Sequence, residues 1–143
     1  MKTTLVTKIF SAKQHEFTTN SALLVFRVLV SLSMINTHGM KKLLNFQETV
    51  NHIPDPMGLG GEASAVIAII ANIVAPVFVI FGLATRLAVI PILGVTLAGF
   101  FIVHGNDPWA VRDVPLMYSL AYSLLFFIGA GKYSLDYKLF KKN

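Results

Sequence analysis

The sequence predicts an all-α fold, an integral membrane bundle of four antiparallel helices. Two runs without a charged residue, 63–84 and 87–103, are each about long enough to cross a hydrocarbon layer of ~30 Å at ~1.5 Å per residue. Only Thr85 and Arg86 separate them, so the two helices must fold back as a hairpin. The composition agrees, because 55% of the residues are hydrophobic and 13% are charged, whereas soluble domains carry about 25% charged residues.

Four spans are expected within a single domain, residues 1–143, at about residues 19–37, 63–84, 87–104 and 114–131. Asn20 or Ser21 is a candidate N-cap for the first. Glu62 falls in the first turn of the second, where the helix dipole favours a negative charge.

Two further helices are expected to lie in the membrane interface. Residues 1–17 place their apolar side chains near one helical face, although a frayed basic tail is an equal alternative. In the first connection between spans, Leu43, Phe46, Val50 and Ile53 repeat at helical spacing. Pro54 then stops that helix.

The basic residues predict the orientation. With four spans, one side of the membrane holds eight of them: Lys2, Lys8, Lys13, Arg86, Lys132, Lys138, Lys141 and Lys142. The other side holds three: Lys41, Lys42 and Arg112. Because cytoplasmic loops are enriched in Lys and Arg, both termini are expected in the cytoplasm. The basic residues lie at chain ends and in loops rather than in one stripe, so we expect contacts with lipid headgroups and no nucleic-acid binding.

The chain has no cysteine, which excludes disulfides, thiolate metal sites and Cys-ligated iron–sulfur clusters. An electron carrier, if one is involved, must come from elsewhere. The histidines show no H-x-x-H or H-E-x-x-H spacing, so no metal site is expected.

Arg27 lies inside the first span and shares a helical face with Ser31, Met34 and His38. A lipid-facing arginine at mid-depth costs at least ~2.5 kcal/mol, so this stripe should face the bundle. Two interpretations remain open. Arg27 forms a structural ion pair, with Asp136 as the expected partner, or a lipid contact; alternatively, it donates to an anionic ligand or a quinone carbonyl.

At the opposite side, polar residues come from the ends of three spans: His38, Lys42, Glu62, His104 and Asp107. Such a group could pass protons to and from a quinol, or could simply make interfacial hydrogen bonds. In the interior, four residues could line a cavity for a flat, partly polar ligand or bond between helices: Asn72, Thr96, Tyr118 and Tyr122.

Three stretches together resemble the DoxX family of small four-span bacterial and archaeal membrane proteins. They are R-(x)10-H-G-x-x-K-L at 27–43, G-L-x-T-R-L-A at 82–88 and G-x-G-K-Y-S-L-D at 129–136. The resemblance implies a place in the cytoplasmic membrane and, for the name-giving members, association with a thiosulfate:quinone oxidoreductase. Family members commonly carry a Glu in the second span where this chain has Asn72. The absence of that carboxylate removes a proton relay or arginine partner and weighs against catalysis.

The favoured hypothesis is a quinone-associated subunit of a membrane oxidoreductase assembly, with no redox centre of its own and with soluble or membrane oxidoreductases as partners. Its candidate quinone-binding residues are Arg27, His38, Asn72, His104 and Tyr122. Structural or topological roles are expected for Arg86, Asp136, Lys42 and Glu62. The alternatives are a scaffold that recruits enzymes through its basic C-terminal tail and a bundle that binds lipid or another small molecule. Whether the chain is an enzyme stays open.

Overall fold

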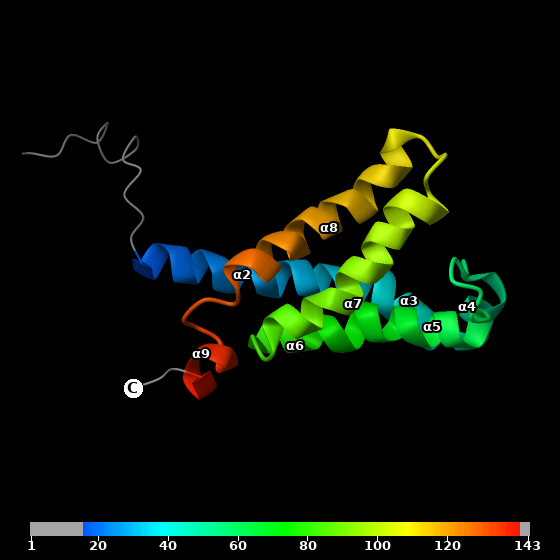
Figure 1. The fold of residues 1–143 in the computed structure, drawn as a ribbon. Coiled ribbons are helices and arrows are strands. Elements are labelled where there is room, and N and C mark those ends of the chain that lie inside the picture. Colours follow the sequence, from blue (N-terminus) through cyan, green and yellow to red (C-terminus); the bar gives the residue numbers. More distant parts are fainter. Residues whose placement is uncertain (1–15, 141–143) are drawn as a thin grey trace, which may run out of the picture.

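The structure, a computed structural model, describes residues 16–140. Four helices in this part of the chain are long and apolar enough to cross a membrane, and they have the bounds Glu16–Leu44, Gly61–Phe81, Thr85–Val103 and Trp109–Ile128. The predicted four-helix membrane bundle is confirmed (Figure 1). Of the predicted N-terminal interfacial helix, residues 1–15 lie outside the described residues, and residues 16 and 17 belong to the first span.

The first span is longer than predicted. It consists of α2 (Glu16–Met34), the π-helix η1 (Ile35–Gly39) and α3 (Met40–Leu44), which follow one another without a break. Its 29 residues extend over about 43 Å, which exceeds the hydrocarbon thickness, so one end must project from it. Neither Asn20 nor Ser21 is an N-cap, because both lie inside α2, which already includes Glu16.

The connection to the second span contains α4 (Phe46–His52), which is the helix that the apolar spacing predicts there. It ends two residues before Pro54, with Ile53 in an extended conformation. The carboxylate of Asp55 then accepts hydrogen bonds from the N–H groups of Leu59 and Gly60 and from Ser64 Oγ, and these bonds lower the pKa of Asp55. This loop therefore has a defined shape and leads directly into the second span.

The second span comprises α5 (Gly61–Ile69), the π-helix η2 (Ile70–Val74) and α6 (Ala75–Phe81), with exposed Glu62 in its first turn. It stops earlier than predicted, because Gly82 adopts φ 66°. The third span comprises α7 (Thr85–Ala98) and the π-helix η3 (Gly99–Val103).

The fourth span, α8 (Trp109–Ile128), begins five residues before the predicted start and ends three residues before the predicted end. Gly129 (φ 85°) and Gly131 (φ 77°) break the helix there. A short helix, α9 (Leu135–Phe140), completes the described part of the chain.

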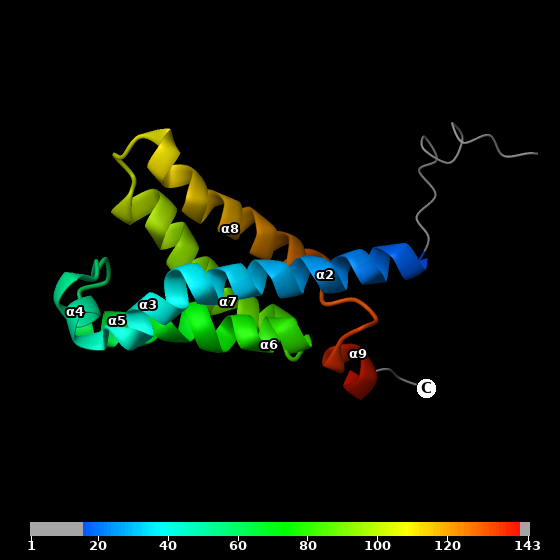
Figure 2. The ribbon, with the colours of Figure 1, turned by 180° about the vertical axis from the view of Figure 1, so that it is seen from behind.

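The four spans form two pairs that diverge. Figures 1 and 2 show α7 and α8 close to α2 and α6 at one end of the bundle and splayed away from α3 and α5 at the other. The core accordingly lies in the closed half and is formed by Met34, Ala75, Val79, Val89, Ile92, Tyr122 and Leu125. Large apolar side chains such as Leu29 and Phe127 stay exposed on the outside, as expected of helices that face lipid.

Candidate functional site

The two ends of the bundle contain the two groups of polar residues. We call the closed end, where Arg27 meets the Gly82–Arg86 turn and α9, the arginine end. We call the open end, where His38, Lys42 and His104 lie, the histidine end. The predicted ligand-binding residues are divided between these ends.

At the histidine end, a cavity of about 780 Å³ occupies the space between the diverging helix pairs. Its lining includes His38, Asn72 and His104 from three different spans, together with Lys42 and Tyr118. Three of the five predicted quinone-binding residues are thus brought to one cavity. Tyr118 and Thr96 also line it, as the sequence predicts, whereas Tyr122 does not.

The three π-helices line this cavity. η1 carries His38, η2 carries Asn72, and η3 carries Gly99, Ile102 and Val103, the last of which directly precedes His104. Such wide turns occur often at functional sites because they redirect side chains and loosen the regular backbone ladder. Sequence periodicity did not reveal them, since a single wide turn barely shifts the helical pattern.

Gly39 explains how η1 and η2 come so close. A Cβ at this position would lie 2.8 Å from the Asn72 carbonyl oxygen and 2.5 Å from Ile73 Cγ1. Only a residue without a side chain lets the two backbones meet here. The H-G pair of the first motif therefore combines a cavity residue, His38, with the contact that positions Asn72.

The cavity contains polar groups without protein partners. Asn72 is only 3% exposed, yet its side-chain amide makes no hydrogen bond to any residue in the described part of the chain. The His38 ring packs edge-on against Tyr118, with the ring centroids 5.3 Å apart, and the amine of Lys42 donates to the His38 carbonyl over 2.9 Å. Buried polar groups are normally hydrogen-bonded. The Asn72 amide is therefore free to bind a ligand or water in the cavity.

The charged groups that line the cavity are all basic. Lys42, His38 and His104 supply positive charge or donors, and among residues 16–140 no Asp or Glu lines the cavity. The Asp107 carboxylate lies beside the cavity mouth and contacts His104 Nδ1 at 2.7 Å. This arrangement fits a molecule that presents hydrogen-bond acceptors or a negative charge.

The cavity also has an apolar side. Exposed Ile90, Ile102 and Val114 belong to its lining and lie on the lipid-facing surface of the spans. Pro54 and Met57, from the loop held by Asp55, form a wall at the histidine end. The cavity therefore combines hydrogen-bond donors with exposed apolar residues of the spans.

Arg27 lies at the other end and has different partners. It is 1% exposed, and its guanidinium donates short hydrogen bonds to the carbonyl oxygens of Ala130 and Tyr133, which follow α8. Gly82 leaves the necessary space, since a Cβ there would lie 2.9 Å from Arg27 Nη1. The structure thus separates Arg27 from the histidines and ties it to the main chain.

The predicted ion pair between Arg27 and Asp136 is not formed. Among the described residues, the ion pairs within 4.0 Å are His104–Asp107 and Lys132–Glu16. The Asp136 carboxylate instead accepts the N–H groups of Ala84 and Thr85 at 2.6 and 2.9 Å and so caps α7. Its own N–H donates to the Gly82 carbonyl over 2.8 Å. Capping was missed because residues 84 and 136 are far apart in sequence.

Tyr122 is a core residue rather than a cavity residue. Its side chain is fully buried, and its hydroxyl donates to Ser31 Oγ over 3.3 Å. Ser31 belongs to the predicted inward-facing stripe of the first span, and this contact links the first span to the fourth. A similar link, Ser119 Oγ to Thr96 Oγ1 at 2.9 Å, joins the fourth span to the third.

Comparison with known proteins identifies the family. The DoxX family model matches residues 22–105. An uncharacterized protein of Haemophilus influenzae is 33% identical over 127 residues, which cover 83% of this chain and 92% of that protein. No solved structure matches. The four apolar spans and these matches together show that the chain is a multi-pass membrane protein that belongs to the DoxX family.

Proposed function

We propose that this protein binds a membrane quinone in the cavity at the histidine end, as a subunit of an oxidoreductase assembly whose other members carry the electrons. The observation on which the proposal rests is Asn72, which is 3% exposed, makes no side-chain hydrogen bond in the described part of the chain, and faces a cavity whose described lining holds no carboxylate. A quinone offers two carbonyl acceptors on a flat ring and an apolar tail. The donors of His38, Lys42 and Asn72 suit the carbonyls, and the exposed apolar residues of the lining suit the tail.

Arg27 and Tyr122 take no part in this proposal, because both already bond within the protein. His104 lies at the mouth beside Asp107 and is placed to exchange protons with a bound headgroup. In the proposed orientation, with both termini in the cytoplasm, that exchange faces the outer side of the membrane.

The test is the quinone content of the protein purified in discs of its own membrane, measured by extraction and absorbance. Asn72→Leu keeps a similar volume and removes the amide, so it should lower quinone content about fivefold, as expected for one hydrogen bond of about 1 kcal/mol. His52→Ala is the matched control, because His52 lies exposed in α4 and outside the cavity lining. Wild-type protein without quinone, in membranes that contain it, would contradict the proposal.

A second candidate function follows from the same cavity. A bundle that binds a different acidic amphiphile, such as a fatty acid, would also use Lys42 and the exposed apolar residues of the lining. Mass spectrometry of the extracted ligand separates the two functions. A carboxylic acid whose retention falls in Lys42→Gln, with quinone absent, would favour this second function.

The hypothesis that the basic C-terminal tail recruits partner enzymes cannot be tested by deleting the tail. Residues 132–140 belong to the fold, since Tyr133 accepts from Arg27 and Asp136 caps α7. Removing them would damage the bundle as well as any docking surface. Neutralising Lys138, which is exposed on α9, changes the tail charge and leaves those contacts in place.

A further inference from the structure

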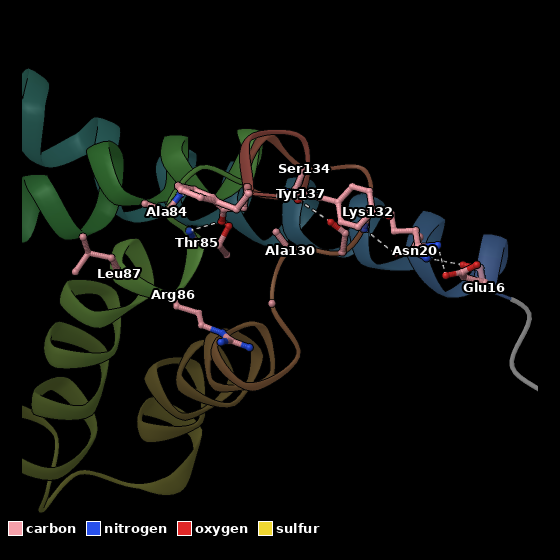
Figure 3. A pocket seen from close by; sticks show the side chains of 14 residues that line it. Glu16, Asn20, Ala84, Thr85, Arg86, Leu87, Ala130, Lys132, Ser134 and Tyr137 are labelled. Carbon is pink, nitrogen blue, oxygen red and sulfur yellow. Dashed lines mark hydrogen bonds and ion pairs between the residues drawn. The ribbon is translucent and has the colours of Figure 1, made fainter. Parts of the chain in front are cut away.

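A second pocket, also of about 780 Å³, lies at the arginine end (Figure 3). It is lined by parts of the first span, the start of α7, the segment after α8, and α9. Because it sits where the third span begins and the fourth ends, it lies at the depth of the lipid headgroups. It is separate from the cavity of the proposed function.

Two cations flank this pocket. Arg86 is exposed, and Figure 3 shows it extending from the start of α7 toward α8, where its one hydrogen bond is a long contact of 3.4 Å to the Phe127 carbonyl. Lys132 pairs with exposed Glu16, which raises the pKa of the lysine. Arg86 is therefore available to a ligand at the membrane surface, whereas Lys132 must share its charge with Glu16.

A third cation lies beneath the pocket floor. Arg27 is buried there and bonded to the carbonyl of Ala130, which is itself part of the lining. No carboxylate of the described residues lies within 4.0 Å of the guanidinium. The two acidic residues of the lining, Glu16 and Asp136, leave an excess of one positive charge among these five groups. Both Asp136 oxygens are already occupied by main-chain N–H groups.

The floor also holds an unused polar group. Thr85 lines the pocket and is 1% exposed, and its hydroxyl has no hydrogen-bond partner in the described part of the chain. The N–H groups of Arg86 and Leu87, in the same first turn of α7, have no partner within the helix. At the rim, Leu87 is 68% exposed and Phe140 is 78% exposed, and both are apolar.

We propose that this pocket binds the phosphate headgroup of an anionic phospholipid. The phosphate lies between Arg86 and Lys132 above the Arg27 charge, within reach of the α7 first turn. The acyl chains lie along Leu87 and the outer face of α8. A free phosphate ion would share the headgroup chemistry but would gain nothing from the apolar rim.

The experiment compares lipid retention by the full chain in discs of neutral phosphatidylcholine mixed with phosphatidylglycerol, read by native mass spectrometry after partial delipidation. Wild-type protein should retain phosphatidylglycerol preferentially. Arg86→Gln should reduce that retention about tenfold, since hydrogen bonds to charged groups are the strong ones. Lys138→Gln is the matched control, because it removes the same charge from exposed α9 outside the lining.

A variant with the opposite expected effect guards against a trivial loss of folding. Glu16→Gln frees Lys132 from its ion pair and should raise phosphatidylglycerol retention above wild type. Equal losses in Arg86→Gln and Lys138→Gln would overturn the proposal, as would unchanged retention in both. Displacement of the lipid by inorganic phosphate, beyond that caused by chloride at the same ionic strength, would also overturn it in favour of a soluble phosphate.

Discussion

The arginine end and the histidine end differ in what their charged and amide side chains bind. At the arginine end, the two terminal nitrogens of Arg27 reach main-chain carbonyls and both oxygens of Asp136 reach main-chain N–H groups. At the histidine end, Asn72 is 3% exposed, lines the cavity, and its amide makes no hydrogen bond in the described part of the chain. The contacts of Arg27 and Asp136 connect distant parts of the chain and so stabilise the fold, whereas the Asn72 amide is open to a ligand. At the arginine end, Arg27 Nε and the Thr85 hydroxyl also lack a partner among the described residues.

The difference also separates two kinds of motif residue. Gly82, Asp136 and Arg27 belong to three motifs that are distant in sequence and meet in one set of contacts. His38 belongs to the first motif as well, but it lies at the other end and lines the cavity. A family signature here therefore combines residues that hold the bundle together with residues that face a ligand.

Loss of the arginine should have the largest effect on stability. We expect Arg27→Gln to lower the free energy of unfolding by about 3 kcal/mol, because the carbonyls of Ala130 and Tyr133 then lose bonds to a charged donor. Arg27→Lys should restore part of this loss, since an ammonium keeps the charge but not the two-pronged geometry. Reversible unfolding in mixed micelles measures both variants. Equal stability of Arg27→Gln and wild type would mean that the arginine end is not the stabilising end.

Gly82→Ala should cause the second-largest loss of stability. The new methyl group would lie 2.5 Å from Ser134 Cβ at a residue with φ 66°, so we expect a loss of about 2 kcal/mol. Gly94→Ala is its control. Gly94 lies inside α7 with open space around it, and an alanine there should raise stability by about 0.5 kcal/mol. Similar melting shifts in the two variants would contradict this interpretation.

At the histidine end, removing a polar side chain should raise stability rather than lower it. Asn72→Leu removes an unpartnered amide from a site that is 3% exposed, so we expect the ligand-free protein to gain about 1 kcal/mol in stability. The same variant should lose quinone. A variant that is less stable without ligand would show that the amide has a structural role, and the contrast between the ends would fail.

The smallest expected effect concerns the loop beside the cavity. Hydrogen bonds from Gly60, Leu59 and Ser64 lower the pKa of Asp55 below its ordinary 3.8. A carboxyl with a lowered folded pKa adds stability above its unfolded pKa and loses it as the pH falls through the folded value. The loop should therefore loosen only below about pH 3.8, and proteolysis between α4 and α5 by an acid protease measures this. Asp55→Ala should be cleaved equally at all pH values.

Much of the fold was predictable because lipid imposes a simple rule. Uncharged runs of about 20 residues must be spans, and a two-residue connection such as Thr85-Arg86 must reverse the chain. The inward stripe of Arg27, Ser31 and Met34 follows from helical spacing, and all three are buried. The sequence predicted a shared depth for His38 and His104 and placed Asn72 in the interior, and only the structure brings all three to one cavity.

The partners of these residues were decided by tertiary structure. Charge alone suggested that Arg27 would pair with Asp136. The glycines after α8 instead turn the chain so that two main-chain carbonyl groups accept hydrogen bonds from the guanidinium. The carboxylate then caps α7, which needs an acceptor at its first N–H groups. Sequence determined that this chain spans the membrane four times and which residues cannot face lipid. Only the packed helices decided which polar groups bind each other and which stay open, because that depends on distances between residues that the sequence places far apart.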